Sequence, residues 1–151
     1  MELILFETPL GVLGLGAEGD AIVRLYLPHT PLPRIACHET PLLLAGKRQL
    51  LDYFEGKRRT FDLPLRFEGE TPFRHQVRQA LLAIPYGETC TYGQLAARVG
   101  CPQGAQAVGQ ANKKNPLPIL IPCHRVVAGK SLGGYSGGPD LKQALLRLEQ
   151  R

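Results

Sequence analysis

A proline-punctuated apolar segment in the C-terminal half restricts the fold more than any other part of the chain. Residues 115–123 read Asn-Pro-Leu-Pro-Ile-Leu-Ile-Pro-Cys. Three prolines in this run exclude a helix, because each removes a backbone N–H donor and disfavours helical geometry at the residue before it. The other side chains are mostly apolar. We therefore expect an extended, buried segment that ends at Cys123.

The first part of the chain is expected to form a small antiparallel sheet covered by one helix. Thr40 and Pro41 form a helix-start signal, and apolar residues recur at helical spacing until Gly56. The segments that favour strands are apolar and β-prone, and turn residues separate them. The expected strands are 2–6, 10–15, 21–27 and, after the helix, 61–65.

A second helix-start signal, at Thr71 and Pro72, marks the expected domain boundary. We expect an N-terminal α/β domain over residues 1–70 with a structural role. Residues 71–151 are expected to form an all-α, winged or helix-turn-helix-like domain that binds DNA and carries the reactive cysteine. The fold class is thus α+β with two domains.

The helix-turn-helix prediction depends on two short helices joined by a glycine-containing turn. Thr91 and Gln94 form a capping box at the start of the first helix, which closes at Gly100, and the second is expected over roughly 103–113. Small residues along the second helix allow close approach either to DNA or to neighbouring helices. A last helix is expected with Asp140 as its cap.

Charge is distributed unevenly between the two halves. Residues 1–71 hold eight Lys and Arg against ten Asp and Glu, a net charge of −2, whereas residues 72–151 hold ten against three, a net charge of +7. A positive half attracts polyanions such as DNA, because binding releases counterions from the phosphates. It also aids solubility, and charge alone does not separate the two explanations.

The composition is typical of a cytoplasmic protein with reduced thiols. No signal peptide or membrane-spanning run is visible, and the four cysteines have no CxxC spacing. Cys37 and His38, with His29 nearby, are candidate metal ligands. A structural zinc site normally takes four well-spaced ligands, so we expect no metal.

Cys123 is the candidate nucleophile. It ends the rigid apolar segment and is followed by His124 and Arg125. A neighbouring base or cation lowers the pKa of a thiol and favours the reactive thiolate. A single cysteine is otherwise most often a small buried apolar residue, so the interpretation depends on these neighbours.

The run from Asn115 to Val127, N-P-L-P-I-L-I-P-C-H-R-V-V, resembles the active-site signature of the O6-alkylguanine-DNA alkyltransferases, also called methylated-DNA–protein-cysteine methyltransferases. The resemblance covers about residues 72–150, whereas the N-terminal part resembles the family only in general plan. It implies stoichiometric, irreversible transfer of an alkyl group from O6-alkylguanine in double-stranded DNA to Cys123, with O4-alkylthymine as a second candidate lesion. It also implies a monomer that needs no cofactor. Further segments that carry the resemblance begin at Tyr92, Ala107 and Gly134 and continue to Leu145, Leu146 and Glu149.

The resemblance assigns catalytic roles to five residues. A Glu, His and water relay, matched by Glu149 and His124, activates Cys123. Asn115 corresponds to a hinge asparagine that braces the helix-turn-helix against the active-site segment, and Tyr92 to a tyrosine that can donate a proton to the departing guanine. From the residues alone, Glu149 reads as a solvated helix residue, Asn115 as a turn residue and Tyr92 as a core or surface aromatic.

The resemblance also implies that the second helix of the motif enters the minor groove and that the target base is flipped into a pocket. Many relatives carry an arginine, which slides into the stack, where this chain has Gln106; glutamine cannot supply a cation there. Tyr135 and Ser136 correspond to the loop over the base. The expected substrate-binding residues are Ala105, Gln106, Gly109, Arg125, Val126, Tyr135 and Ser136.

Three other functions compete with this prediction. An alkyltransferase-like lesion sensor binds alkylguanine without repairing it, but such proteins generally lack the acceptor cysteine that Cys123 supplies. A helix-turn-helix regulator requires rich base contacts from the major groove, which the small side chains of 103–111 do not offer. A Cys/His hydrolase requires an oxyanion-hole loop, and we identify none.

Overall fold

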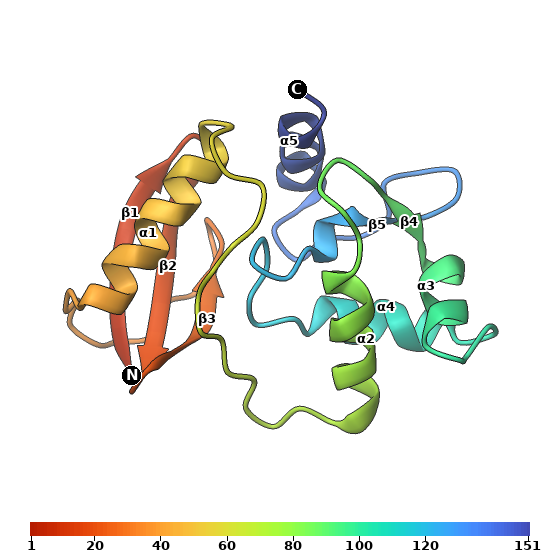
Figure 1. Ribbon diagram of the computed structural model, residues 1–151, viewed down its shortest axis with the longest axis horizontal. Coiled ribbons are helices and arrows are strands. Elements are labelled where there is room, and N and C mark those ends of the chain that lie inside the picture. The colour runs from red at the N-terminus through yellow and green to blue at the C-terminus, as the bar shows by residue number, and fades with distance from the viewer. The chain divides into compact units, whose positions relative to one another are not determined.

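The structure is a computed structural model that describes all 151 residues (Figure 1). It divides into two compact units, Met1–Glu68 with the terminal Arg151, and Gly69–Gln150. The first unit is a three-stranded antiparallel sheet in the order β1-β2-β3, with one helix packed on it. This confirms the small sheet and helix expected from the sequence. Its elements are β1 (Glu2–Thr8), β2 (Gly11–Glu18), β3 (Ala21–Tyr26) and α1 (Pro41–Phe54).

Local signals account for how α1 begins and how closely it approaches the sheet. The Thr40 hydroxyl accepts a hydrogen bond from the Leu43 N–H at 3.2 Å, as expected of an N-cap residue. Gly46 faces the sheet: a Cβ at that position would lie 2.9 Å from Leu15 Cδ1 and 3.1 Å from Ile22 Cδ1. A residue with no side chain therefore lets the helix pack directly on the sheet.

The strand expected at 61–65 does not form. Only Leu65 makes an isolated parallel bridge, to Ile22, and the Ile22 N–H donates to the Pro64 carbonyl at 2.8 Å. Pro64 itself has no N–H to donate, so a longer ladder cannot develop there.

The second unit is mainly helical, and α3 and α4 form the expected helix-turn-helix pair. The Thr91 hydroxyl accepts from the Gln94 N–H at 3.1 Å, and the Gln94 side chain accepts from the Thr91 N–H at 2.9 Å, which completes the predicted capping box. The helices are α2 (Pro72–Leu82), α3 (Tyr92–Arg98), α4 (Ala105–Lys113), the 3₁₀ turn η1 (Cys123–Arg125) and α5 (Pro139–Glu149).

The expectation of an all-α unit was wrong in one respect. Two short parallel strands, β4 (Cys90–Thr91) and β5 (Val126–Val127), pair with Cys90 opposite Val126. They join the residues just before α3 to the residues just after η1. Strands of two residues are too short to show a period of two in the sequence.

Asp140 is not the cap of the last helix. The N-cap of α5 is Gly138, whose φ of 95° suits a glycine, and Asp140 lies in the first turn. A carboxylate in the first turn still interacts favourably with the positive end of the helix dipole.

None of the helices is long and apolar enough to cross a membrane.

The segment 115–123 is buried as predicted, but it folds back on itself instead of running extended. Leu117, Ile119 and Ile121 are each no more than 2% exposed, and the Ile121 N–H donates to the Leu117 carbonyl at 2.8 Å. Ile119 has a φ of 73°, which is unfavourable for a β-branched residue. The surrounding contacts must therefore hold this turn in place.

Candidate active site

Asn115 braces the turn that leads to Cys123. Its Nδ2 donates to the Ile121 carbonyl at 3.1 Å, and its Oδ1 accepts from the Leu117 N–H at 3.0 Å. One side chain thus fixes both ends of the turn. Cys123 lies two residues after Ile121, at the start of η1, and is 3% exposed.

His124 and Glu149 form a buried pair. His124 Nε2 donates to Glu149 Oε2 at 2.7 Å, and both side chains are at most 1% exposed. A carboxylate only accepts hydrogen bonds, so this contact places the imidazole proton on Nε2. His124 Nδ1 is then a free acceptor, and it is buried without a hydrogen-bond partner. Burial lowers the pKa of His124 below its usual 6.5, so the ring is neutral at pH 7.

Arg125 turns toward Glu149. Its Nε and Nη2 donate to the two carboxylate oxygens at 2.8 and 3.0 Å, and its Nη1 donates to the Ile84 carbonyl at 2.7 Å. The guanidinium also lies 5.7 Å from the Tyr86 ring centre. The structure therefore places Arg125 in the Glu149 network, where it positions the carboxylate. Arg125 does not line the groove along α4.

Burial controls the state of the Cys123 thiol. It raises the pKa of this thiol to about 11, and the Asn115 amide and the positive charge of Lys142 act in the opposite direction. The sequence-based expectation of a lowered pKa was therefore wrong: desolvation outweighs the polar neighbours. The resting site holds a protonated thiol beside a neutral imidazole, and the sulfur must lose its proton during the reaction.

Lys142 is a site residue that the sequence analysis missed. Its side chain is fully buried, and its ammonium donates to the Val126 carbonyl and, at 3.1 Å, to the Gly134 carbonyl. Burial lowers the pKa of Lys142, while the nearby Cys123 sulfur acts to raise it. The ammonium also lies 5.9 Å from the centre of the Tyr92 ring. A cation whose hydrogen-bond acceptors are neutral carbonyls stabilises a neighbouring thiolate. Helical spacing places residue 142 on the same face as Leu145 and Glu149, which was the available signal.

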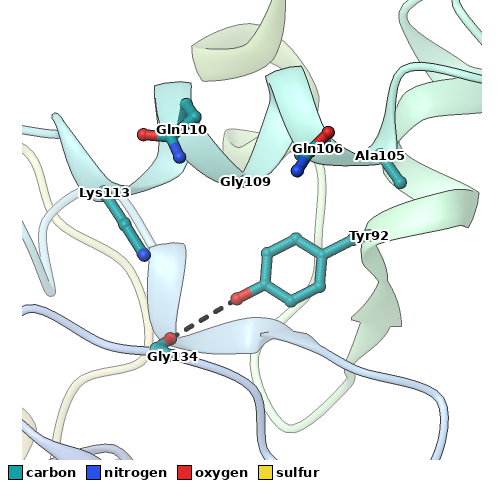
Figure 2. Close-up of a pocket in the computed structure, with 7 residues that line it drawn as sticks. All are labelled: Tyr92, Ala105, Gln106, Gly109, Gln110, Lys113 and Gly134. Atoms are coloured by element: carbon teal, nitrogen blue, oxygen red, sulfur yellow. Dashed lines mark hydrogen bonds between the residues drawn. The ribbon is translucent and has the colours of Figure 1, made fainter.

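An open groove of about 460 Å³ runs along one face of α4 (Figure 2). The Tyr92 hydroxyl points across it and donates to the Gly134 carbonyl at 3.4 Å. Burial, and then the nearby Cys123 sulfur, raise the pKa of Tyr92, which keeps the phenol protonated. The groove brings together four expected residues and adds three. Its lining residues are Tyr92, Ala105, Gln106, Gly109, Gln110, Lys113 and Gly134.

The remaining expected pocket residues lie on β5 and the glycine-rich loop. The Val126 side chain is fully buried, and Ser136 is exposed. The Tyr135 hydroxyl is buried without a hydrogen-bond partner; burial raises the pKa of this phenol, and the Cys123 and Glu149 charges act in the same direction. Tyr135 thus has a buried hydroxyl, whereas Ser136 faces solvent.

No group of three or more His, Cys, Asp or Glu side chains is placed to hold a metal ion. Cys37 is exposed, and His38 lies 3.5 Å from the Glu2 carboxylate. What the second unit does offer is a thiol that is adjacent in sequence to an imidazole, and a carboxylate that orients this imidazole.

Removing the charge of Lys142 is expected to slow reaction at the Cys123 sulfur. Lys142→Met should react about ten-fold more slowly with iodoacetamide at neutral pH, the effect of roughly one pKa unit. Lys142→Arg should lose less, because it keeps a cation. The rate is measured by mass spectrometry of the modified Cys123 peptide. Lys130→Met, which removes an exposed lysine, is the matched control, and equal rates for both methionine variants would contradict a role for the charge.

A reactive cysteine beside a His–Glu pair, on a unit that carries a helix-turn-helix, defines a DNA-binding protein with a nucleophilic thiol. Two family models match: the 6-O-methylguanine DNA methyltransferase DNA binding domain over residues 72–151, and the ribonuclease-like domain of the same enzyme over residues 2–67. The chain belongs to the 6-O-methylguanine DNA methyltransferase family.

Individual relatives agree with this membership. The constitutive methylated-DNA–protein-cysteine methyltransferase of Bacillus subtilis is 47% identical, over 95% of this chain and 92% of the relative. The Methanosarcina acetivorans methylated-DNA–protein-cysteine methyltransferase is 38% identical, over 99% and 98% of the two chains. The crystal structure of Mycobacterium tuberculosis OGT in complex with DNA superposes with a TM-score of 0.91 at 38% identity, covering 99% of this chain and 93% of that one.

Proposed function

We propose that this protein repairs DNA by direct reversal, taking the alkyl group of O6-alkylguanine onto Cys123 once per molecule. The observation that carries the proposal is the buried Cys123, His124 and Glu149 arrangement on a helix-turn-helix unit. Relatives named as methylated-DNA–protein-cysteine methyltransferases match across nearly the whole chain. We place DNA binding and transfer in residues 71–151 and a structural role in residues 1–70. We also propose that the protein acts in the cytoplasm. It acts as a monomer, because a single-use reaction needs one site.

The transfer begins with removal of the thiol proton. In this proposal a water carries the proton from Cys123 to Nδ1 of His124, the buried acceptor that has no other partner. Glu149 accepts the Nε2 proton and stabilises the imidazolium that forms. Lys142 and Asn115 stabilise the new thiolate.

The thiolate sulfur then attacks the alkyl carbon. A carbon–sulfur bond forms as the bond between that carbon and O6 breaks, and the bonding pair remains with the purine. Tyr92, whose phenol is protonated at neutral pH, donates a proton to the departing guanine and regains one from the imidazolium through solvent. The thioether at Cys123 has no leaving route at neutral pH, so the protein is consumed and needs no cofactor.

The target base reaches the sulfur only after it leaves the DNA stack, at a cost of a few kcal/mol. We propose that α4 enters the minor groove of the DNA. Ala105 and Gly109, which line the groove of the protein along α4, are small enough to let the helix approach the DNA closely. A bent, widened minor groove offsets part of the flipping cost. The Tyr135–Ser136 loop then covers the base. The partner is double-stranded DNA, consistent with the relative that was crystallised in complex with DNA.

A single experiment tests the proposal: intact mass measurement after incubation with a duplex that contains O6-methylguanine. We expect a gain of one methylene equivalent, mapped to Cys123. Cys123→Ser should gain nothing and still bind the duplex, because only the nucleophile is lost. An unmodified wild-type Cys123 with intact lesion would favour a lesion sensor of the alkyltransferase-like type.

The pH dependence of transfer follows from His124. Its pKa lies below 6.5 in the folded protein because burial disfavours the charged ring, so the base stays available at and above pH 6.5. We expect single-turnover rates to hold steady from about pH 8 to pH 6.5 and to fall only at lower pH, as Nδ1 becomes protonated. A decline that begins above pH 6.5 would assign the limiting titration to another group.

Gln106 lines the groove on α4, at the position where the family resemblance implies an arginine in many relatives. Glutamine fills space and forms hydrogen bonds but supplies no cation. Gln106→Arg is therefore expected to tighten binding to duplex DNA or to speed transfer several-fold, measured by fluorescence anisotropy and single-turnover kinetics. Gln76→Arg on α2 controls for the added charge. If affinity and rate match those of the wild type, residue 106 does not limit flipping.

A further inference from the structure

Arg125 is a buried charge inside the candidate active site that the proposed chemistry leaves unused. The residue is 7% exposed, and a guanidinium stays charged at any physiological pH. Its Nε and Nη2 donate to the two oxygens of Glu149, and its Nη1 donates to the Ile84 carbonyl. Desolvation of two such ions is costly, and packed apolar residues often replace a buried pair without loss of stability. Stability alone therefore does not explain this cation.

One oxygen of Glu149 serves both the guanidinium and the imidazole. Oε2 accepts from His124 Nε2 at 2.7 Å and from Arg125 Nη2 at 3.0 Å. A carboxylate without a cation would favour a protonated imidazole at this position, because an opposite charge at close range stabilises the charged form. Arg125 holds the same carboxylate with two hydrogen bonds, so its positive charge compensates this effect.

The other charges near His124 also oppose its protonation. On α5, Glu149 favours the charged ring and Lys142 disfavours it, and Arg125 in η1 disfavours it as well. Burial is the largest cause of the lowered pKa of His124 and acts in the same direction as the two cations. The Cys123 thiol adds no charge at rest, because burial raises its pKa to about 11. Two cations thus face the ring against one anion.

The neighbouring loops hold the ion pair without changing its charge. From the loop before β4, Gly87 donates its backbone N–H to Glu149 Oε1 at 3.3 Å, and the Tyr86 ring faces the Arg125 guanidinium at 5.7 Å. From the glycine-rich loop, Tyr135 contributes a phenol whose pKa is raised by burial, so it stays neutral. The compensation of Glu149 therefore depends on Arg125.

A protein that reacts only once is lost if its thiol is consumed before it meets DNA. Oxidants and stray electrophiles attack the thiolate, so susceptibility follows thiolate character. We propose that Arg125 is a positioning residue that protects Cys123: by compensating the Glu149 charge, it keeps His124 from drawing the thiol proton before an alkylated base is bound. The inference rests on the proposed function and adds to it a control on when the nucleophile is activated.

Neutralising Arg125 should raise the pKa of His124 above its ordinary 6.5, by about one unit or more relative to the wild type. Arg125→Met removes the charge, and Arg125→Gln removes it but keeps an N–H donor, so the test survives if one variant fails to fold. Arg125→Lys keeps a cation and should keep the pKa low. The pKa is read by NMR from the ring nitrogen shifts of DNA-free protein, assigned with His124→Asn. Arg147→Met, which removes an exposed arginine from α5, is the matched control and should leave the titration unchanged.

A second substitution separates the effect of charge from that of loosened packing. Loss of burial alone would return the pKa of His124 to about 6.5, and it would stay there whatever the charge of residue 149. Arg125→Met combined with Glu149→Gln removes both charges, so the pKa should fall below 6.5 again. Neutral groups often replace a buried ion pair without loss of stability, so we expect this double variant to fold.

The protective role is measured on the thiol itself. Each unit by which the pKa of His124 rises makes the thiolate–imidazolium form about ten-fold more populated. Arg125→Met and Arg125→Gln should therefore react about ten-fold faster than the wild type with iodoacetamide at neutral pH, followed by mass spectrometry of the Cys123 peptide. The double variant should return to the wild-type rate.

Each contrary outcome overturns one claim. If the pKa of His124 stays below 6.5 in the folded neutral variants, or if Cys123 reacts no faster in them, Arg125 does not protect the thiol. A raised pKa that persists in the double variant would also overturn the proposal, because loosened packing would then be its cause. None of these measurements uses DNA. Failure of wild-type Cys123 to take up a methyl group from an O6-methylguanine duplex would instead overturn the proposed function.

Discussion

The buried carboxylate of Glu149 organises the second unit. It accepts hydrogen bonds from the Gly87 N–H at 3.3 Å, from His124 at 2.7 Å, and from Nε and Nη2 of Arg125. These donors come from the loop before β4 and from η1, so one charge ties two segments to the end of α5. Removing one partner of such a buried network typically lowers the free energy of unfolding by about 3–5 kcal/mol, because the remaining charge is buried without a partner or solvent to compensate it.

Burial moves the titratable groups around the sulfur toward their neutral forms. It raises the pKa values of Cys123 and Tyr92 and lowers those of His124 and Lys142. The Cys123 sulfur and the His124 imidazole are therefore both neutral before a substrate arrives. Charge separation between sulfur and imidazole then occurs next to Lys142 and Glu149, which are already in place and need no reorganisation.

Sequence patterns predicted the parts of the fold that depend on local interactions. Caps at Thr40 and Thr91 fixed the starts of α1 and α3, because a cap is a contact between residues three apart. Two-residue strands have no period to detect, and a proline at 64 limited a plausible strand to one bridge. At the site, the catalytic set came from a family resemblance, whereas Lys142 was missed. It is a polar residue on a helix, and only tertiary packing decides that such a residue is buried.

The prolines that exclude a helix in residues 115–123 also explain how the chain tolerates a strained turn before its nucleophile. They restrict the unfolded chain, so less conformational entropy is lost when the turn forms. That gain, with the two Asn115 hydrogen bonds, offsets the positive φ of Ile119. An enzyme with turnover must also open to release product. A protein that reacts once has no such step, so a rigid, buried cysteine carries no kinetic disadvantage after transfer.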